Sequence, residues 1–247
     1  MTNPRPMRMY AELAKWWPLL SPPKEYVEEA EDLLPDLKSA ADGTPKTLLE
    51  LGCGGGSLAY HLKNHFTLTL SDISEDMLAV SRAVNPECEH VQGDMTSLDL
   101  GRTFDLVLIH DAIMYMNSAE AMRAAIATVA RHCRPGGGVA LLPDCVKETF
   151  EPSTDCGGHD ADDGRALRYL EWSWDPDPND DFYKVIYVFA LRENGTTRTE
   201  TERHQNGLFP RETWLKWLRE AGFTPRSRMD RWERDVFIGS NFSPTGK

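Results

Sequence analysis

The chain has 247 residues with 27 Lys and Arg against 39 Asp and Glu, and this net charge of −12 argues against a protein that tracks nucleic-acid phosphates. Hydrophobic residues make up 40% of the chain, enough for one sizeable core, so we expect a single domain over 1–247. The apolar runs are too short to cross a membrane and the N terminus lacks a signal-peptide core, so we expect a cytoplasmic protein. The five cysteines have no CxxC spacing, which predicts reduced thiols and no zinc.

The N-terminal residues 1–44 show a helical pattern after the breaker at 21–23, and Pro35 is expected to kink or end that helix. From residue 47 the pattern changes to short apolar strands that alternate with amphipathic helices. Such alternation predicts an α/β fold in which crossover helices join parallel strands. The expected strands are 47–51, 67–72, 89–94, 104–111 and 138–144, and the expected helices are 57–66, 75–84 and 118–133.

After Asp144 the regular alternation stops, and the segment 146–208 reads as an antiparallel β insertion. Its expected strands are 169–175, 182–192 and 196–204, with hairpin signals at 175–180 and 193–195. A last helix over 210–222 carries tryptophans on one face, and a strand over 233–241 completes the sheet.

The stretch 48–62, LLELGCGGGSLAYHL, carries the strongest chemical signal. An apolar strand ends in Glu50 and passes through Gly52, Gly54 and Gly56 into a helix. Glycines in this position let the backbone approach a ligand closely, and the amides at the helix start are free to bind it. A glycine turn alone is equally typical of any α/β fold.

Two further strand ends add support for a nucleoside site. Asp72 ends the second strand, where a carboxylate can accept hydrogen bonds from both ribose hydroxyls. Asp94 and Met95 follow the third strand in VQGDM and offer a carboxylate and an apolar side chain to an adenine ring. The sequence FDLVLIHD at the fourth strand and the RPGGG turn before the fifth complete an ordered set.

This ordered set resembles the class I S-adenosylmethionine-dependent methyltransferases, and the resemblance covers residues 45–145. It implies a Rossmann-like, seven-stranded, mostly parallel sheet with helices on both faces. It also implies that S-adenosyl-L-methionine is the cofactor and S-adenosyl-L-homocysteine the product. The residues implied to bind the cofactor are Tyr10, Glu50, Gly52, Cys53, Gly54, Gly56, Asp72, Ile73, Met77, Asp94, Met95, His110 and Asp111.

The flanking segments resemble small-molecule methyltransferases, in a layout similar to that of amino-sugar N-methyltransferases. By this resemblance 1–44 is an N-terminal helical lid, 45–145 the cofactor-binding core, 146–208 a substrate-covering sheet and 209–247 the final helix and strand. The implied partner is a small-molecule acceptor, with no nucleic acid and no membrane, and a homodimer is a further expectation. No Asn-Pro-Pro-Tyr-type motif follows the fourth strand, as base-amine methyltransferases would require.

Two histidines are candidates for the general base that takes a proton from the acceptor. His110 leaves the carboxyl end of a central strand, so it projects towards the ligand crevice, although a bond to a neighbour would equally explain it. His204 lies on a strand of the insertion, where a solvated histidine is the alternative. Asp111, next to His110, could simply cap the following turn.

The aromatic residues of the insertion could roof an apolar acceptor, although core packing or a dimer surface is an equal alternative. They are Trp172, Trp174, Phe182, Tyr183 and Tyr187. Asp160, Asp162 and Glu171 resemble a calcium loop only faintly, because Arg165 takes the position that requires glycine, and no metal is expected.

The sequence therefore predicts an enzyme that transfers a methyl group by in-line displacement to an N or O nucleophile of a small molecule. Two alternatives remain open at this point. A non-catalytic S-adenosylmethionine-binding module acting with a partner would keep the glycine turn, Asp72 and Asp94. An NAD-dependent oxidoreductase would place Ser57 in the last glycine position of its fingerprint and would not explain Glu50.

Overall fold

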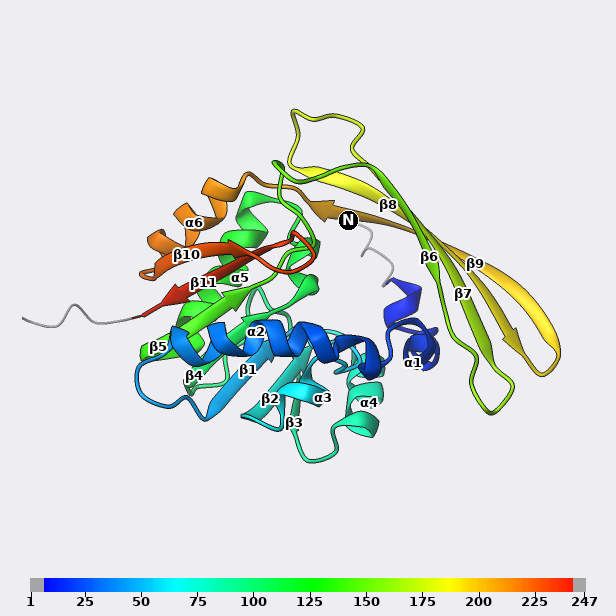
Figure 1. Ribbon diagram of the computed structural model, residues 1–247, viewed down its shortest axis with the longest axis horizontal. Helices are drawn as coiled ribbons and strands as arrows, with labels where there is room; N and C mark the ends of the chain where they lie inside the picture. The colour runs from blue at the N-terminus through cyan, green and yellow to red at the C-terminus, as the bar shows by residue number, and fades with distance from the viewer. Residues whose placement is uncertain (1–6, 242–247) are drawn as a thin grey trace, which may run out of the picture.

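The computed structural model describes residues 7–241 and contains two β-sheets (Figure 1). A seven-stranded core sheet has the order β10-β11-β5-β4-β1-β2-β3, and a four-stranded antiparallel sheet has the order β6-β7-β8-β9. The core strands are β1 (Thr47–Leu51), β2 (Thr67–Asp72), β3 (Glu89–Gln92), β4 (Phe104–Ile109), β5 (Cys133–Leu141), β10 (Thr224–Met229) and β11 (Asp235–Ser240).

Strands β1 to β5 run parallel to one another, and only β11 is antiparallel to its neighbours β5 and β10. Parallel neighbours require a crossover connection, which the helices supply. The predicted seven-stranded, mostly parallel sheet with an antiparallel insertion is confirmed.

Apolar cores cover both faces of the core sheet, because successive strand residues point to opposite sides. Leu48 packs on the face of α2 (Val27–Ala40), α3 (Ala59–Leu62) and α4 (Glu75–Val84). Leu49 packs on the face of α5 (Ala119–His132) and α6 (Arg211–Glu220). The near-continuous apolar strands are typical of a sheet that is buried on both faces.

The antiparallel sheet consists of β6 (Ser153–Gly157), β7 (Ala166–Trp174), β8 (Phe182–Glu193) and β9 (Thr196–Gly207). Asn194 and Gly195 connect β8 and β9 with φ of 53° and 74°. Positive φ at both central residues defines the type I′ turn that the sequence ENG favours. The sheet curves away from the core sheet (Figure 1).

The N-terminal segment, residues 7–26, lies between the two sheets. It contains three short 3-10 turns and α1 (Trp17–Leu20). Met9, Leu13 and Trp16 are buried against Leu167 and Phe189 of the antiparallel sheet. The segment also contacts the core, since the Ser74 hydroxyl donates a hydrogen bond to the Tyr10 carbonyl.

The sequence analysis missed two strands, and both lie at a sheet edge. Residues of β6 are nearly all exposed, and β10 alternates only between exposed and half-buried positions, so neither shows an apolar pattern. The expected helix 57–66 is shorter, since α3 covers only Ala59–Leu62. Helix α2 continues through Pro35 to Ala40, so the expected end of the helix at Pro35 is wrong.

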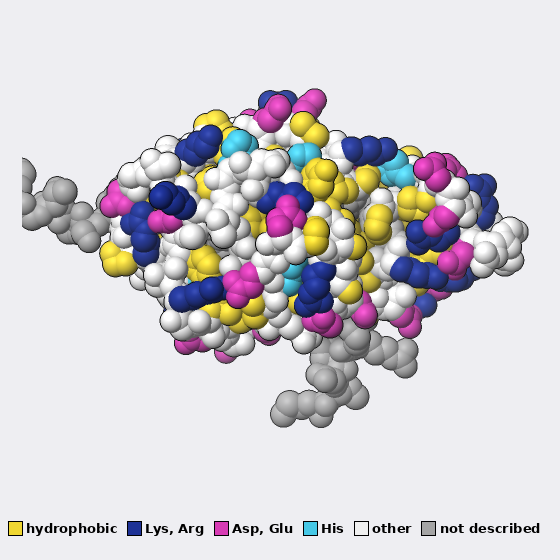
Figure 2. Space-filling view, turned by 90° about the horizontal axis from the view of Figure 1, so that it is seen from below, with side chains coloured by type: hydrophobic (Ala, Val, Ile, Leu, Met, Phe, Trp, Pro, Cys, Tyr) yellow, Lys and Arg dark blue, Asp and Glu magenta, His cyan; other side chains and the backbone are white. Residues whose placement is uncertain are grey.

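The surface seen from below in Figure 1 carries Lys and Arg side chains interspersed with Asp and Glu (Figure 2). Within residues 7–241, no helix is long and apolar enough to span a membrane.

Candidate active site

The candidate site lies at the carboxyl edge of the core sheet, where parallel strands β1, β2, β4 and β5 all end. Glu50, Asp72, His110 and Asp144 lie within or just after these four strands. In open α/β sheets ligands bind outside the carboxyl ends of the strands, at the point where the strand order reverses. Here β1 lies between β2 and β4, so this point falls beside the glycine turn.

The glycine turn after β1 has the backbone that its sequence requires. Gly52, Gly54 and Gly56 have φ of 73°, 54° and 75°, in the left-handed region that other residues rarely adopt. The Gly52 and Cys53 amides both donate to the Ser71 carbonyl of β2, at 2.7 and 2.9 Å. These bonds fix the turn against the neighbouring strand.

Gly55 serves a different purpose from the other glycines of the turn. A Cβ atom there would lie 2.1 Å from the indole of Trp17, so only glycine lets the N-terminal segment pack on the turn. Trp17 in turn lies 5.5 Å from Tyr10, between ring centroids. The docked segment therefore explains Gly55, the middle one of three consecutive glycines.

Asp72 is buried beside the glycine turn and is oriented by two backbone amides. Gly54 N donates to its Oδ2 at 2.9 Å and Ser74 N to its Oδ1 at 2.8 Å. Each carboxylate oxygen can accept a second hydrogen bond, so the group can still bind two hydroxyls. The adjacent Ile73 side chain is 66% exposed, an unusual position for an isoleucine and one that suits contact with a flat apolar ring.

Glu50 is almost fully buried, and its Oε2 atom has no hydrogen-bond partner among the described residues. Burial, with smaller contributions from Asp111 and Asp72, raises the pKa of the Glu50 carboxyl to about 7. A buried carboxyl without a partner is costly, and a cationic ligand group would remove that cost.

These residues fit S-adenosylmethionine. The orphaned Glu50 oxygen can take the amino group of the methionine part, the glycine backbone leaves room for it, and Asp72 can take the ribose. Met95 and Ile73 offer apolar contacts, and the Asp94 carboxylate is held beside them by the Thr96 amide at 2.7 Å. Met77 is buried behind the turn, and its terminal methyl lies 3.6 Å from the Cβ position of Gly54.

A chain of four side chains runs from the N-terminal segment into the antiparallel sheet. The hydroxyls of Tyr10 and Tyr115 are 2.6 Å apart, and the Tyr115 hydroxyl lies 3.2 Å from His204 Nδ1. His204 Nε2 lies 3.0 Å from Oε2 of Glu202. A carboxylate only accepts hydrogen bonds, so a neutral His204 ring carries its proton on Nε2 and turns the lone pair of Nδ1 towards Tyr115.

His110 is part of a different, ionic network. Its Nε2 lies 2.8 Å from Glu29 Oε1 on α2, and Arg234 from the β10–β11 turn bonds the same oxygen. Burial lowers the pKa of His110, but Asp111 and Glu29 outweigh this effect and raise it to about 9. His110 is therefore an imidazolium at neutral pH and ties α2 to the edge of the core sheet.

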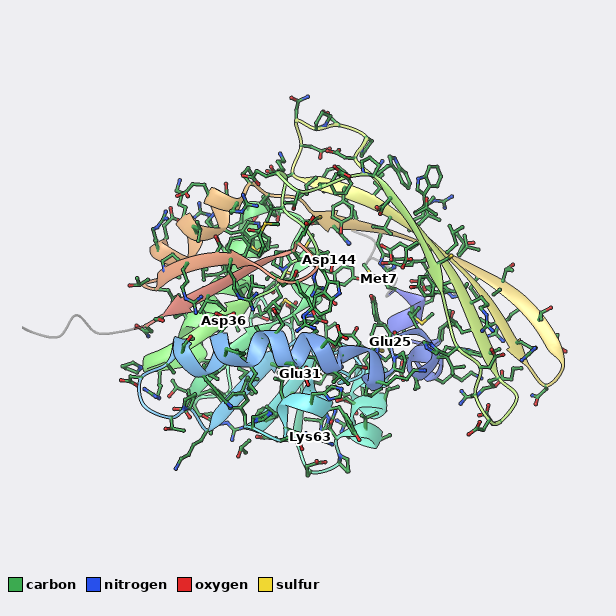
Figure 3. All side chains as sticks on the ribbon, viewed as in Figure 1. Met7, Glu25, Glu31, Asp36, Lys63 and Asp144 are labelled. Atoms are coloured by element: carbon green, nitrogen blue, oxygen red, sulfur yellow. The ribbon has the colours of Figure 1, made fainter. Side chains whose placement is uncertain are left out.

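A polar hollow of about 500 Å³ opens beside this edge, between the loop after β5, the antiparallel sheet and the β10–β11 turn. Asp144 and Glu171 line it, and Figure 3 shows Asp144 in the space between the two sheets. Solvent reaches the Asp144 side chain, yet burial by surrounding protein raises the pKa of its carboxyl well above the usual range. Both properties fit a carboxyl group that faces an enclosed hollow.

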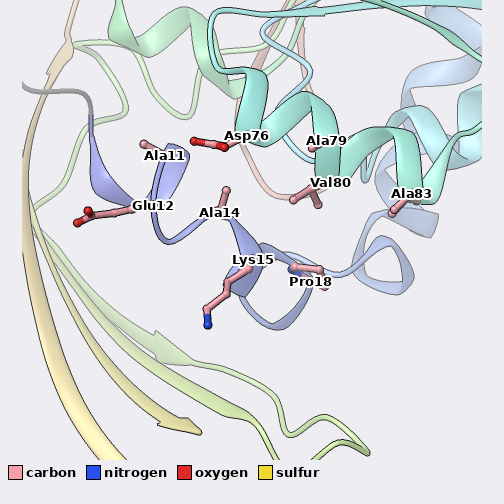
Figure 4. Close-up of a pocket in the computed structure, with 10 residues that line it drawn as sticks. Ala11, Glu12, Ala14, Lys15, Pro18, Asp76, Ala79, Val80 and Ala83 are labelled. Carbon is pink, nitrogen blue, oxygen red and sulfur yellow. The ribbon is translucent and has the colours of Figure 1, made fainter.

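A second groove, about 480 Å³, separates the N-terminal segment from α4 (Figure 4). Small apolar side chains dominate its walls, among them Ala14, Ala79 and Ala83. Glu12, Lys15 and Asp76 also line it, but none of its lining residues belongs to the glycine turn, to the strand ends of the cofactor edge or to the polar hollow.

The structure brings most of the predicted site residues to one place, but it divides the aromatic residues of the insertion between two faces. Tyr183 and Tyr187 point inward, whereas Trp172 is 50% exposed on the outer face beside Trp174. Asp160 of the calcium-like loop pairs with Arg168 and Arg192. His204, for which a solvated position was an alternative, is buried.

The sequence analysis missed four site residues, namely Tyr115, Asp144, Glu171 and Glu202. Tyr115 and Asp144 follow the fourth and fifth strands, and position alone could have singled them out. Glu171 and Glu202 show an inward position only through the alternation of their strands, and on β9 the long polar run TTRTETERH obscures that alternation around Glu202.

Comparison with known proteins agrees with this geometry. Residues 48–137 match a family described as a methyltransferase domain. A curated relative from Streptomyces fradiae, a dTDP-3-amino-3,6-dideoxy-alpha-D-glucopyranose N,N-dimethyltransferase, is 30% identical over 81% of this chain and 78% of its own. Another curated relative is the Streptomyces venezuelae dTDP-3-amino-3,4,6-trideoxy-alpha-D-glucopyranose N,N-dimethyltransferase. It is 36% identical over 51% of this chain, and the match spans about half (54%) of that relative's own length.

Solved structures give the same result. The crystal structure of Streptomyces venezuelae DesVI superposes with a TM-score of 0.79 at 26% identity, over 90% of this chain and 94% of that one. The sugar N-methyltransferase KedS8 from Streptoalloteichus sp. ATCC 53650 has the same fold, with a TM-score of 0.80 at 24% identity over 98% and 96% of the two chains.

The core is Rossmann-like, and β1 contains an acidic residue just before the glycine turn. With the acidic end of β2 and the aspartate after β3, these features define a class I methyltransferase fold. The chain belongs to the S-adenosylmethionine-dependent methyltransferases of the small-molecule type, in the layout of the amino-sugar N-methyltransferases. It is an enzyme, and S-adenosylmethionine is its methyl donor.

Replacing Asp72 tests the cofactor site. Asp72→Ala should weaken S-adenosylhomocysteine binding by about 1.5 to 3 kcal/mol, the range for hydrogen bonds to a charged group, in a protein that still folds. Isothermal calorimetry measures the affinity, and Asp76→Ala, an exposed aspartate on the first turn of α4, is the matched control. Equal affinities in the two variants would remove Asp72 from the site.

The His110 network predicts how stability depends on pH. Because the folded pKa of about 9 exceeds the ordinary value of 6.5, His110 contributes stability that is complete below pH 6.5 and is lost as the pH rises through 9. Between pH 6 and pH 10 the wild type should lose on the order of 3 kcal/mol more unfolding free energy than His110→Gln. Urea denaturation at both pH values measures this, and parallel losses would contradict it.

Proposed function

We propose that this enzyme methylates the amino group of a small, polar amine of the amino-sugar class. The observation that carries the proposal is the Tyr10–Tyr115–His204 chain, which runs from the N-terminal segment to a buried histidine and a carboxylate. The printed names of the two curated relatives, both amino-sugar N,N-dimethyltransferases, support the same acceptor class.

The cofactor supplies a methyl group that is already activated by its sulfonium. An amine attacks it only through its nitrogen lone pair, and most aliphatic amines carry an extra proton at neutral pH. The protein must therefore remove one proton from the acceptor before transfer and then hold the amine in line with the methyl group. Positioning of this kind can supply up to about 7 to 11 kcal/mol of the barrier.

The relay can remove that proton in one concerted shift. The acceptor ammonium gives a proton to the Tyr10 oxygen, Tyr10 passes its own proton to Tyr115, and Tyr115 passes its proton to His204 Nδ1. Burial raises the pKa of the Tyr115 phenol well above the usual value, so the hydroxyl relays a proton and does not itself ionise. The product imidazolium faces Glu202, whose negative charge stabilises it.

His204 is a better base than His110, although His110 leaves the central sheet. His110 already carries its proton at neutral pH and is held by Glu29 and Arg234, so it has no lone pair to offer. His204 has a lone pair that faces a hydroxyl. We therefore assign the base to His204, and His110 the role of fixing α2 against the site.

The hollow that holds Asp144 and Glu171 is the acceptor pocket in this proposal. Four of its described lining residues are acidic (Asp144, Glu151, Glu171 and Glu233), and its basic residue, Arg234, is already paired with Asp230 and Glu29. Two like charges about 6 Å apart near a protein surface repel by about 3 kcal/mol. Burial and the charge of Asp111 raise the pKa of the Asp144 carboxyl, and a bound ammonium lowers that pKa again and stabilises the carboxylate. The pocket therefore favours a cationic amine, free or glycosidic, over an amine carried on a nucleoside diphosphate.

The N-terminal segment acts as the lid over the cofactor, and the antiparallel sheet covers the acceptor. The segment is held on both sides, by Ser74 of the core and by Glu202 of the sheet. A cytoplasmic location and a homodimer stay predictions from the sequence.

Removing the proton relay should lower turnover while cofactor affinity stays nearly constant. His204→Gln and Tyr115→Phe should each reduce kcat about 10²- to 10⁴-fold with an amino-sugar acceptor at pH 7, and their rates should recover as rising pH deprotonates the free amine. Methyl transfer from labelled cofactor measures the rate, and His65→Gln, an exposed histidine, is the control. Wild-type rates in both relay variants would leave positioning as the only source of catalysis.

The acceptor pocket is tested through Asp144. Asp144→Asn keeps the shape of the side chain but cannot form the carboxylate that a bound ammonium stabilises, so KM for a cationic amine should rise about 10- to 100-fold, the equivalent of one charged hydrogen bond. Asp162→Asn, an exposed aspartate outside the pocket, is the control. The same kinetics with free and nucleoside-diphosphate-linked amino sugars should favour the free amine, and preference for the linked form would reject the charge argument.

A further inference from the structure

Glu202 is a buried glutamate on the inner face of β9, and it makes two hydrogen bonds to two different parts of the protein. Its Oε2 accepts from His204 Nε2 at 3.0 Å, and its Oε1 accepts from the backbone amide of Met9 at 2.7 Å. Its exposed fraction is 7%, so no bulk solvent can replace either partner. One carboxylate therefore binds the histidine of the relay and the N-terminal segment at the same time.

Both partners of Glu202 are donors, and this fact restricts the residue that can stand there. A carboxylate accepts at both oxygens, whereas a glutamine amide accepts at one atom and donates at the other. With its oxygen on His204, glutamine would turn its NH₂ group against the Met9 amide. With its oxygen on Met9, its NH₂ group would donate to Nε2 and force the His204 proton onto Nδ1.

The contact with Met9 determines where the next residue lies. Tyr10 follows Met9 directly, and its hydroxyl is 2.6 Å from the Tyr115 hydroxyl. Tyr115 belongs to the core, in the 3-10 turn Asp111–Tyr115, whereas His204 and Glu202 belong to the antiparallel sheet. The relay therefore spans three separate parts of the chain and exists only when they meet.

The opposite side of the N-terminal segment reaches the cofactor site. The Tyr10 carbonyl accepts from the Ser74 hydroxyl, and the Ser74 amide donates to Asp72. The docked position of Tyr10 thus depends on Glu202 on one side and on the residue beside the ribose carboxylate on the other.

We propose that Glu202 is a positioning residue that holds His204 in its proton-accepting tautomer and fixes Tyr10 beside Tyr115 with the same carboxylate. The base is thus complete only while the N-terminal segment is docked over the cofactor. This inference rests on the proton relay of the proposed function. It adds that proton removal is tied to closure, so the acceptor is not deprotonated in an open site.

A structural clamp without a role in the relay would behave differently. It would hold the N-terminal segment, but its loss would not change the His204 ring. Glu200 offers the matched comparison, because it lies two residues away on the same strand, pairs with Arg8 of the segment and makes no contact with His204.

The experiment compares Glu202→Gln, His204→Gln, Glu200→Gln and the wild type by three measurements. Imidazole ¹⁵N NMR reports the His204 tautomer, amide hydrogen exchange reports the docking of Met9, and methyl transfer reports kcat. In Glu202→Gln we expect an altered tautomer or faster Met9 exchange, according to which way the amide turns, and in either case a kcat about 10²- to 10⁴-fold lower. The double variant Glu202→Gln/His204→Gln should be no slower than His204→Gln, because the two residues act as a unit.

Glu200→Gln should leave the tautomer and kcat unchanged, and His204→Gln should leave Met9 exchange unchanged. A wild-type tautomer together with wild-type Met9 exchange in Glu202→Gln would overturn the proposal, and so would an equal effect of Glu200→Gln on kcat. If Glu202→Gln does not fold, Glu202→Asp undergoes the same measurements, since its shorter reach cannot span both donors. A wild type that methylates no amine would refute the proposed function, while the NMR and exchange results would still decide the role of Glu202.

Discussion

The parallel arrangement of β1, β2, β4 and β5 is the constraint on which the rest of the molecule depends. Parallel neighbours end at the same edge, so residues that are far apart in the sequence but follow the strands meet there. Glu50, Asp72, His110 and Asp144 come together for this reason alone. A single edge thereby collects several groups that are costly to bury, and the N-terminal segment and the antiparallel sheet enclose them.

The two inward histidines show that surroundings, and not residue type, decide chemical behaviour. His110 lies between Glu29 and Asp111, and these carboxylates hold the proton on its ring. His204 meets one carboxylate on one nitrogen and a neutral hydroxyl on the other. The first arrangement favours a permanent cation with a structural role, and the second leaves one ring nitrogen facing a hydroxyl, as the proposed relay requires. Because the two histidines have different neighbours, one site can contain both kinds of imidazole.

The fold and the cofactor edge could be predicted from the sequence because their signals are local. The glycine turn, the acidic strand ends and the apolar strands each lie within a short window. The edge strands β6 and β10 could not be predicted, since exposure removes the apolar alternation that identifies a strand. The partners of Tyr115 and Glu202 could not be predicted either, because they are Tyr10 and Met9, about a hundred and two hundred residues away.

The alternation of β9 has a consequence for how this chain can tolerate change. Glu202, His204 and Asn206 point inward, and Thr201, Arg203 and Gln205 point to solvent. Substitutions at the solvent positions leave the inner row unchanged, so they should have little effect on stability or on the site. An insertion or deletion of one residue would exchange the two rows, exposing the histidine and burying an arginine in its place. The length of this hairpin is therefore far more restricted than its composition, and homologous chains should vary here by substitution and hardly ever by a single-residue gap.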